Sequence, residues 1–248
     1  MGTVLITGGG TGIGRAAALL FVERGARVLL VGRRRERLEQ AAAAARARAG
    51  AGGDVAWQEA DMTRDEQVRA AVAATVARFG ALDVLVNSAG SAPVWTPVHE
   101  TSDETWERAL DVNLTGAFRA MRAALPHLVA SRGSIVNISS ISALRASNAV
   151  ASYSAAKAGL IALTRCVAAE YGWQGVRCNC IVPSWVDTPM TEGFLADDGI
   201  RADVARRHAL QRVATPEEVA RMIVFLAGDD AAFVTGGIHA VDGGMAAL

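Results

Sequence analysis

Two side chains near the middle of the chain are suited to acid–base chemistry on an oxygen atom. Tyr153 and Lys157 are four positions apart, so on a helix they lie on the same face. A phenol ionises near pH 10 in water, and an ammonium ion beside it favours the phenolate. Lowering the phenol pKa by about 2–3 units corresponds to roughly 3–4 kcal/mol of differential stabilisation. The pair could therefore exchange a proton with a carbonyl or hydroxyl oxygen at neutral pH.

Lys157 is the only lysine in a chain whose 25 basic residues are otherwise arginine. A compact ammonium ion suits a position beside a phenol better than the flat, bulkier fork of an arginine. The chain thus keeps a lysine where this chemistry favours one. An ordinary amphipathic helix, with a packed tyrosine and a solvated lysine, would show the same spacing, so the pair needs support from the rest of the chain.

A glycine-rich run near the start of the chain is suited to binding phosphate. Its sequence is Thr7-Gly8-Gly9-Gly10-Thr11-Gly12-Ile13-Gly14, and it joins the first expected strand to the first expected helix. Glycines permit a tight turn and a close backbone approach, and a helix N-terminus offers free N–H groups with a partial positive charge. A glycine cluster is often just a turn, but between a strand and a helix it predicts a dinucleotide site. The contacts expected here are Gly8, Thr11, Gly12, Ile13 and Gly14.

The end of the second expected strand carries no carboxylate. A site for NAD usually places Asp or Glu there to accept hydrogen bonds from the adenine ribose. The chain instead continues into Arg33-Arg34-Arg35, and Arg33 could form paired, charge-assisted hydrogen bonds to a 2′-phosphate, with Arg34 as a second candidate. The basic run also begins a helix, where positive charge opposes the helix dipole, so helix stability does not explain it. We therefore expect NADP(H) in preference to NAD(H).

Short β-rich runs alternate with longer helical stretches along the chain. Several runs are almost continuously apolar, as expected of strands covered on both faces. This alternation predicts an α/β fold, a doubly wound (Rossmann) parallel sheet with helices on both faces. The expected strands are Val4–Thr7, Arg27–Val31, Asp54–Glu59, Val84–Asn87, Ser134–Ile138, Arg177–Val182 and Ile238–Val241. The expected helices are Ile13–Arg24, Arg35–Ala49, Asp65–Phe79, Ser102–Ala130, Ala151–Tyr171 and Pro216–Ala227, the last with a capping box from Thr215 to Glu218.

No linker-like segment interrupts this pattern, so residues 1–248 are expected to form a single dinucleotide-binding and catalytic domain. The least regular stretch follows the sixth strand, over Ser184–Arg201. Ligands of open α/β sheets bind beyond the carboxyl ends of the strands. Residues 184–210 are therefore expected to form a lid or wall of the substrate site.

Over essentially its whole length the chain resembles the short-chain dehydrogenase/reductase family. The glycine spacing Thr7-Gly8-x-x-x-Gly12-x-Gly14 has that family's form and not the Gly-x-Gly-x-x-Gly form. In pattern the chain is most similar to the 3-oxoacyl-thioester (acyl-carrier-protein) reductases, including its ending His239-Ala240-Val241-Asp242-Gly243-Gly244-Met245. The further family motifs, in order, are Asn87-Ser88-Ala89-Gly90, Asn113, Ser140, Tyr153-x-x-x-Lys157, Pro183 and Thr188.

The resemblance implies a role for each member of the catalytic set. Tyr153 would donate a proton to the carbonyl oxygen during reduction, or take one from the alcohol during oxidation. Ser140, favoured over the neighbouring serines by its spacing from Tyr153, would hold the same oxygen. Lys157 would lower the phenol pKa, helped by the positive charge of the oxidised nicotinamide, and bind the nicotinamide ribose. Asn113 would hold a water that links Lys157 to solvent; alternatively, it could be a helix-kink residue that satisfies its own backbone.

The same resemblance assigns the remaining cofactor contacts. Asp61 and Met62 would face the adenine, although Asp61 could instead cap the turn that follows it. Thr188 would hold the nicotinamide carboxamide. Two positions depart from the family pattern: Ser184 replaces the usual glycine after the proline, and Thr11 stands where many NADP-using relatives carry a basic residue. The further expected contacts are Asn87, Ala89, Gly90, Pro183 and Val186, with Tyr153 and Lys157 at the nicotinamide end.

The expected function is the NADPH-dependent reduction of a ketone, such as a 3-oxoacyl thioester, to a secondary alcohol, or the reverse reaction. The expected pocket walls are apolar and aromatic with Arg145 as the one charged exception, so we expect an uncharged, fairly apolar substrate. The alternatives are an NAD-dependent alcohol or sugar dehydrogenase and a non-catalytic dinucleotide-binding sensor, the latter disfavoured by the complete catalytic set. Members of the family are usually tetramers, so we expect a homotetramer. The expected wall residues are Trp95, Leu144, Val150, Trp185, Met190 and Phe194.

The composition excludes several other classes of function. Basic and acidic residues balance at 25 each, so no global basic field is present to bind nucleic acid or an anionic membrane. No apolar run is long enough to span a bilayer and no secretory signal pattern is visible, which predicts a cytoplasmic protein. The three cysteines are expected to be reduced thiols, with Cys178 and Cys180 packed in the core, and no metal site is expected.

Overall fold

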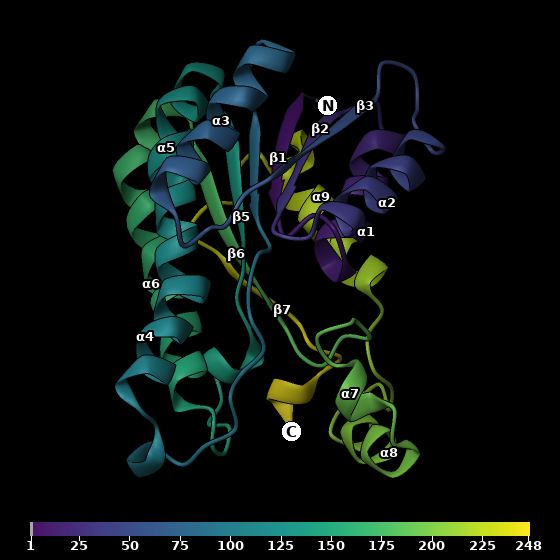
Figure 1. Cartoon of the computed structure of the whole chain (residues 1–248), viewed down its shortest axis with the longest axis vertical. Coiled ribbons are helices and arrows are strands. Elements are labelled where there is room, and N and C mark those ends of the chain that lie inside the picture. Colours follow the sequence, from purple (N-terminus) through teal and green to yellow (C-terminus); the bar gives the residue numbers. More distant parts are fainter. Residues whose placement is uncertain (1) are drawn as a thin grey trace.

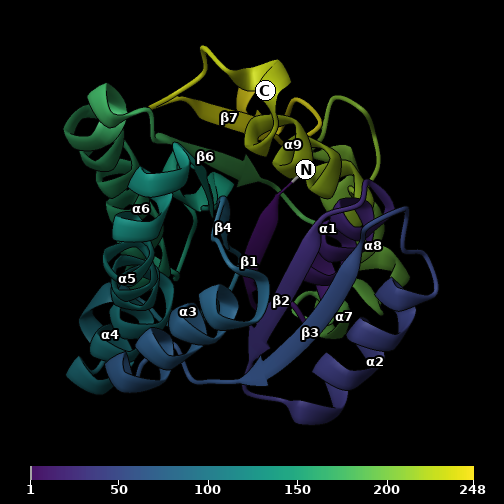
Figure 2. The same ribbon diagram turned by 90° about the horizontal axis from the view of Figure 1, so that it is seen from above.

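A parallel β-sheet of seven strands runs through the centre of the protein, and Figure 2 shows it from above. The computed structural model describes residues 2–248. The strands are β1 (Thr3–Thr7), β2 (Arg27–Gly32), β3 (Asp54–Glu59), β4 (Val84–Asn87), β5 (Ser134–Ile138), β6 (Arg177–Pro183) and β7 (Ile238–Val241). Their order, β3-β2-β1-β4-β5-β6-β7, reverses direction between β1 and β4, as in a doubly wound (Rossmann) sheet. The predicted fold class is confirmed, and each predicted strand lies within one residue of its observed bounds.

Helices cover both faces of this sheet (Figure 1). One face carries α1 (Gly12–Glu23), α2 (Arg35–Arg46) and α9 (Pro216–Ala227). The other face carries α3 (Asp65–Phe79), α4 (Asp103–Leu110), α5 (Gly116–Ser131) and α6 (Ala151–Tyr171). Two short helices, α7 (Glu192–Leu195) and α8 (Asp198–Arg206), lie beyond the carboxyl ends of the strands.

The sheet separates two apolar cores. Along β1, Val4 and Ile6 pack into the core shared with α1, α2 and α9, whereas Leu5 packs into the core shared with α3, α5 and α6. Successive side chains of a strand point to opposite faces, so β1 contributes to both cores and all five of its residues are buried. Burial on both faces explains why these strands read as continuous apolar runs in the sequence.

The predicted continuous helix over Ser102–Ala130 is wrong in its middle. A π-helical turn over Asp111–Thr115 separates α4 from α5. The side-chain amide of Asn113, within this turn, donates a hydrogen bond of 3.1 Å to the carbonyl of Ala109 and so satisfies backbone where the regular helical ladder is interrupted. Composition does not signal this turn, because its residues are compatible with an α-helix.

The segment that follows β6 is more regular than predicted, since it contains α7 and α8. Its two ends are joined by an isolated parallel bridge between Val186 and Ala214, so the intervening residues form a closed loop at the edge of the site. The next helix, α9, begins with the predicted capping box, in which the Thr215 hydroxyl and the Glu218 carboxylate each accept a backbone N–H.

Two predictions from composition can be compared with the structure. All three cysteines are free, and Cys178 and Cys180 are fully buried as predicted, whereas Cys166 is exposed. Within residues 2–248, no helix combines the length and the apolar character that a bilayer-spanning segment needs.

Candidate active site

A cleft of about 1000 Å³ opens beyond the carboxyl ends of the strands. Ligand pockets span ~300–1000 Å³, so this cleft has room for a dinucleotide and a small second molecule. It is also the place where open α/β sheets bind their ligands. The predicted site residues that line it are Gly8, Thr11, Gly12, Ile13, Arg33, Arg34, Asp61, Met62, Ala89, Gly90, Asn113, Ser140, Tyr153, Lys157, Pro183, Val186 and Thr188. Two predicted residues, Gly14 and Asn87, do not line the cleft.

The glycine-rich loop shapes the N-terminus of α1. Gly12 has φ of +52°, a region that L side chains rarely adopt, and a Cβ there would lie 3.1 Å from Cγ2 of Thr188. Gly14 is buried behind the loop, where a Cβ would lie 2.5 Å from the carbonyl oxygen of Gly8. The absence of a side chain at Gly14 therefore lets α1 approach the loop. The positive end of α1, with no acidic side chain in its first turn, fits the pyrophosphate of a dinucleotide.

Asn87 is likewise a supporting residue and not a residue of the cleft surface. Its side chain is 3% exposed, and its amide donates a hydrogen bond of 2.8 Å to Oδ1 of Asn137, its register partner on β5. The Asn137 amide in turn donates to the Thr164 hydroxyl of α6 at 2.9 Å. This buried polar chain ties β4, which Ala89 and Gly90 follow, to the helix that carries Tyr153.

Arginines form a basic corner of the cleft after β2. Arg33, Arg34 and Arg37 line it, and none of them forms an ion pair within residues 2–248. Nη2 of Arg34 donates to Oγ1 of Thr11 at 3.3 Å, so a basic group reaches the position where Thr11 departs from the family pattern. Unpaired guanidinium groups at this end fit a 2′-phosphate.

Asp61 caps the turn that follows it, and it also lines the cleft. It lines the cleft, and its Oδ1 accepts hydrogen bonds of 2.9 Å from both the backbone N–H and the hydroxyl of Thr63. Partial burial raises the pKa of Asp61, but the Thr63 bonds and the charges of Arg33 and Arg64 outweigh this, so the pKa lies below its usual value. The Asp61 carboxylate therefore stays ionised at neutral pH and holds the turn at the adenine end.

Tyr153 and Lys157 both project from α6 to the floor of the cleft, where Nζ of Lys157 lies 5.7 Å from the centroid of the phenol ring. Burial raises the pKa of Tyr153, and a hydrogen bond with the Ser140 side chain opposes this effect. The neighbouring serines are engaged elsewhere: the Ser139 hydroxyl donates to the carbonyl of Lys157 at 2.8 Å, and the Ser142 hydroxyl accepts from the Ser147 hydroxyl at 3.1 Å. The geometry thus places Ser140, and not its neighbours, beside the phenol.

The ammonium group of Lys157 is held under the cleft. The residue is 5% exposed, and Nζ donates to the carbonyl of Ile138 at 2.9 Å. Burial lowers the pKa of Lys157 to about 8, while the nearby Cys180 thiol acts in the opposite direction. The ammonium group is thus directed at Ile138 and also lies 5.7 Å from the centroid of the Tyr153 ring. A pKa near 8 does suit a group that gives up and regains protons close to neutral pH.

Asn113 reaches this floor from the π-helical turn. Its Oδ1 accepts from the N–H of Ser91 at 3.1 Å, and its amide donates to the Ser91 hydroxyl at the same distance. A Cβ on Gly90 would lie 3.0 Å from Asn113 Oδ1 and 3.6 Å from Lys157 Nζ, so these two side chains meet at the same glycine. The Asn113 side chain therefore satisfies its own helix backbone at Ala109, which was the alternative prediction for it, and it also lies close to Lys157.

The segment that follows β6 is fastened to the end of that strand by a residue that sequence reasoning missed. His208, which is 1% exposed, lies with Nε2 2.8 Å from the Ser184 hydroxyl and Nδ1 2.8 Å from the carbonyl of Val204. Thr188 is held by Thr191, whose hydroxyl accepts from the Thr188 N–H at 3.2 Å and donates to the Val186 carbonyl at 2.6 Å. The unusual serine at position 184 was the only sign in the sequence of a special contact there. Nothing in the sequence indicated that its partner is His208, 24 residues later.

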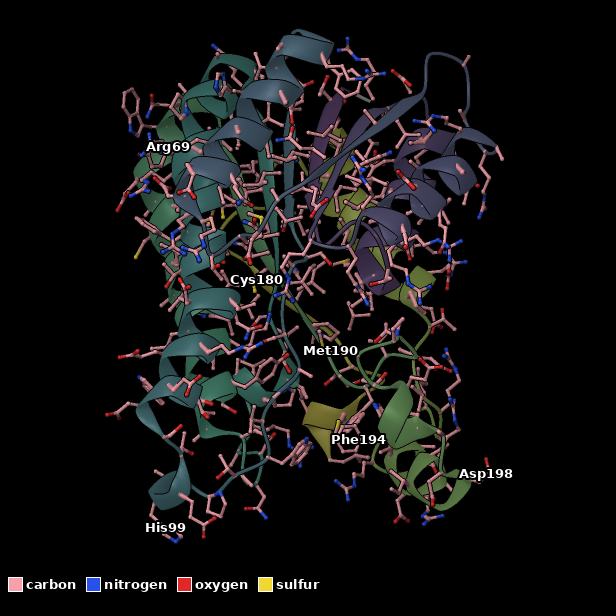
Figure 3. The ribbon with its side chains drawn as sticks, in the orientation of Figure 1. Arg69, His99, Cys180, Met190, Phe194 and Asp198 are labelled. Carbon is pink, nitrogen blue, oxygen red and sulfur yellow. The ribbon has the colours of Figure 1, made fainter. Side chains whose placement is uncertain are left out.

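The far end of the cleft combines aromatic walls with arginines. The ring of Phe194 lies 5.7 Å from that of Trp95 and 6.1 Å from that of Trp185, centroid to centroid. Figure 3 shows Met190 and Phe194 on the lid segment. Arg145 lines this end as predicted, but Arg206 and Arg207 line it as well, so the lining is more basic than the sequence indicated. The predicted wall residue Leu144 does not line the cleft, whereas the other predicted wall residues do.

Comparisons with known proteins agree over almost the entire chain. A family model described as enoyl-(acyl carrier protein) reductase matches residues 8–246. Cis-4-hydroxycyclohexanecarboxylate dehydrogenase of Sinomonas cyclohexanicum is 43% identical over 98% of this chain and 96% of that protein. A 3-oxoacyl-[acyl-carrier-protein] reductase of Chlamydia muridarum is 37% identical over 98% of this chain and 96% of that protein. The structure of a short-chain type dehydrogenase/reductase from Mycobacterium ulcerans superposes with a TM-score of 0.94 at 34% identity, covering 98% of this chain and 89% of that one.

Proposed function

Because this chain belongs to the short-chain dehydrogenase/reductase family and is an oxidoreductase of alcohol and ketone groups, we propose that it interconverts a ketone and a secondary alcohol with NADP(H). The observation that carries the proposal is the meeting of Tyr153, Ser140 and Lys157 on the floor of one cleft whose other end holds unpaired arginines. A bound nicotinamide dinucleotide supplies the hydride in reduction and accepts it in oxidation.

Tyr153 is the proton donor and acceptor in this proposal. The Ser140 hydroxyl beside the phenol can hold the substrate oxygen at hydrogen-bond distance from Tyr153. Burial keeps the phenol protonated at neutral pH, which is the form that donates a proton to a carbonyl oxygen. In the reverse direction the phenolate takes the hydroxyl proton of the alcohol.

Lys157 and Asn113 serve the proton supply. A lysine with a pKa of about 8 can pass a proton at the pH of the cell, and it lies against the tyrosine ring. Asn113 and Lys157 meet at Gly90, where the Asn113 amide is anchored to Ser91. We therefore assign to Asn113 the positioning of a proton path between Lys157 and solvent.

The cofactor preference rests on the basic corner. The N-terminus of α1 would hold the pyrophosphate, while Arg33 and Arg34 would hold a 2′-phosphate. The cofactor-facing set carried over from the family also includes Thr188 and Val186, which border the phosphate loop and the lid. The alternative function is that of an NAD-linked dehydrogenase. NAD has no 2′-phosphate, so Arg33 and Arg34 would then have no phosphate to bind.

The substrate is a ketone or secondary alcohol of modest size with an apolar body. The aromatic walls formed by Trp95, Trp185 and Phe194 support this. One relative is named for a hydroxylated cyclohexane ring and another for a 3-oxoacyl chain, so ring ketones and 3-oxoacyl thioesters are the substrates to test first.

The test is a spectrophotometric assay of purified protein with both cofactors. NADPH should be oxidised in the presence of a ring ketone or a 3-oxoacyl thioester, and its dissociation constant should be at least tenfold lower than that of NADH. Tighter binding of NADH would overturn the assignment of Arg33 and Arg34. The absence of turnover with any ketone or alcohol would overturn the proposed activity.

We also propose a homotetramer. Two large side chains on the helices that family members use for assembly are exposed, Trp106 on α4 at 42% and Phe118 on α5 at 41%. Sedimentation velocity measures the assembly directly, and a monomer at micromolar concentration would contradict it.

A further inference from the structure

The end of the cleft away from the phosphate loop is basic. Arg145, after β5, and Arg206 and Arg207, at the end of α8, line it. Among residues 2–248, the lining includes a single acidic side chain, Asp61, and that residue lies at the adenine end. The substrate end therefore carries positive charge with no acidic side chain of the lining to balance it.

The three arginines differ in their partners. Arg206 forms an ion pair with Asp203, so its charge is compensated. Arg145 donates to the carbonyl of Met245, which engages its hydrogen-bonding capacity but leaves its charge without a counter-ion. Arg207 forms no ion pair within the described part of the chain. Arg145 and Arg207 are thus the two uncompensated charges.

Arg145 contacts the short segment of residues 243–245 directly, and the residues that follow Arg207 in the chain pack against the same segment. Arg145 reaches it through Met245. The residues that follow Arg207 pack against it from the lid side: the N–H of Leu210 donates to the carbonyl of Gly243 at 3.1 Å, and a Cβ on Gly244 would lie 2.7 Å from Cβ of Ala209. Arg145 and the stretch just after Arg207 therefore border the same segment at the edge of the cleft that both arginines line.

Aromatic rings also line this cleft. Trp185 and Phe194 stand edge to face, with ring centroids 6.1 Å apart, and the Trp95 ring lies 5.7 Å from that of Phe194. A molecule that fills the cleft contacts Tyr153, these rings and the two arginines. Such a molecule would have an apolar body and a polar group in addition to the reacting carbon.

We propose that this end of the cleft is an anion-binding subsite, and that the substrate carries a carboxylate or phosphate bound by Arg207 and Arg145. The proposal rests on the proposed function for the position of the reacting oxygen. Guanidinium groups bind carboxylate and phosphate oxygens through charge-assisted hydrogen bonds, and these bonds gain strength beside apolar walls. The uncharged substrate expected from the sequence would leave both charges without a counter-ion in the cleft.

The direct test is a binding experiment that requires no turnover. The enzyme, saturated with whichever nicotinamide dinucleotide it binds more tightly, is titrated calorimetrically with cyclohexanecarboxylate and with cyclohexanecarboxamide. The two probes have the same ring and differ in charge. The carboxylate should bind at least tenfold more tightly, and Arg207→Gln and Arg145→Gln should each lower this ratio at least fivefold. Arg207→Lys, which keeps the charge, should retain most of the ratio.

Arg206→Gln is the matched control, because Arg206 neighbours Arg207 but is already paired with Asp203. It should leave the carboxylate-to-carboxamide ratio within twofold of the wild-type value. Equal affinity of the wild-type enzyme for both probes would overturn the subsite, as would a ratio that survives unchanged in both Arg207→Gln and Arg145→Gln.

A second pair of probes identifies the kind of anion. Pantetheine 4′-phosphate and pantetheine differ only in the phosphate that thioester carriers provide. A larger ratio for this pair than for the ring pair assigns the subsite to a carrier phosphate, and the reverse assigns it to a substrate carboxylate.

Turnover is measured separately with 4-oxocyclohexanecarboxylate and 4-methylcyclohexanone. If neither ketone is reduced, the proposed function is contradicted for ring ketones while the binding ratio still decides the subsite. If both are reduced with equal kcat/KM, the proposed function stands and the anion-binding subsite is overturned.

Discussion

The hydroxyl of Ser184 lies 2.8 Å from Nε2 of His208, and this contact fastens the lid to the sheet. The other ring nitrogen, Nδ1, lies 2.8 Å from the carbonyl of Val204, which can only accept a hydrogen bond. In the neutral imidazole, Nδ1 therefore carries the proton and Nε2 accepts from Ser184. A glycine at position 184, usual in the family, has no hydroxyl to offer, so the departure from the family pattern has a structural partner.

Replacing Ser184 by alanine should destabilise the protein. The substitution leaves Nε2 of a histidine that is 1% exposed without a donor, and an unsatisfied buried polar atom costs about 1–3 kcal/mol. Urea unfolding monitored by circular dichroism measures the loss. Ser154→Ala is the matched control, because the Ser154 hydroxyl is buried with no partner within residues 2–248 and its removal should change the free energy of unfolding by less than about 0.5 kcal/mol. Equal effects of the two substitutions would contradict the role of the Ser184–His208 contact.

Tyr153→Phe should abolish turnover and leave cofactor binding intact. The substitution removes the one hydroxyl placed to exchange a proton with the substrate and keeps the ring that packs beside Lys157. Since positioned acid–base groups contribute about 10²–10⁴-fold, kcat should fall by at least a hundredfold. The dissociation constant for NADPH, from fluorescence titration, should stay within twofold. Tyr171→Phe, at the only other tyrosine and on the same helix, should retain wild-type kcat, and an active Tyr153→Phe enzyme would refute the mechanism.

Lys157→Met should raise the free energy of unfolding at pH 7 while abolishing activity. Burial lowers the pKa of Lys157 from 10.5 to about 8, which corresponds to a cost of about 3 kcal/mol while the lysine is charged. Losing the hydrogen bond to Ile138 costs the variant about 1 kcal/mol. We therefore expect its free energy of unfolding to be higher than that of the wild type by about 2 kcal/mol.

The stability gain expected for Lys157→Met depends on pH. Between about pH 8 and pH 10.5 the unfolded lysine holds a proton that the folded lysine has lost, so wild-type stability rises with pH in this window. The advantage of Lys157→Met should therefore be constant below pH 8 and shrink above it. Urea unfolding of both proteins at pH 7 and pH 10 measures this, and an advantage that does not change between these pH values would refute a buried, destabilised ammonium group.

The parts of the site that sequence reasoning located correctly depend on local spacing. Tyr153 and Lys157 share a helix face because they are four residues apart, and the glycine-rich loop joins a strand to a helix, so neighbouring residues alone fix both features. The positions of the strands could likewise be predicted, because a strand buried on both faces has an almost continuous run of apolar residues.

The parts that were missed depend on contacts between distant segments. The Asn87 side chain is buried against Asn137, its register partner fifty residues later, and no local pattern encodes that pairing. Arg207 enters the cleft because the adjacent His208 is buried under Ser184, a contact that only the folded lid creates. The π-helical turn around Asn113 has ordinary helical composition and is defined by its packing.

Cofactor preference should depend on Arg33 and Arg34 and not on the next arginine along the chain. Arg33 and Arg34 line the cleft without an ion pair, whereas Arg35 packs over the Trp57 ring and pairs with Glu39. A charge-assisted hydrogen bond is worth about 1.5–3 kcal/mol, so Arg33→Ala should weaken NADPH binding about tenfold or more. NADH binding should stay within twofold, because that cofactor has no 2′-phosphate.

The control and the salt dependence make this prediction specific. Arg35→Ala removes the same charge one or two positions away, and it should change neither dissociation constant by more than about twofold, since Arg35 does not line the cleft. Because Arg33 and Arg34 are exposed, the preference for NADPH should also fall as ionic strength rises from about 0.01 M to 1 M, where the screening length shortens from about 30 Å to 3 Å. Fluorescence titration with both cofactors at each salt concentration measures the preference. Equal losses of NADPH affinity in Arg33→Ala and Arg35→Ala would mean that the general positive charge of this region, and not a phosphate site after β2, attracts the cofactor.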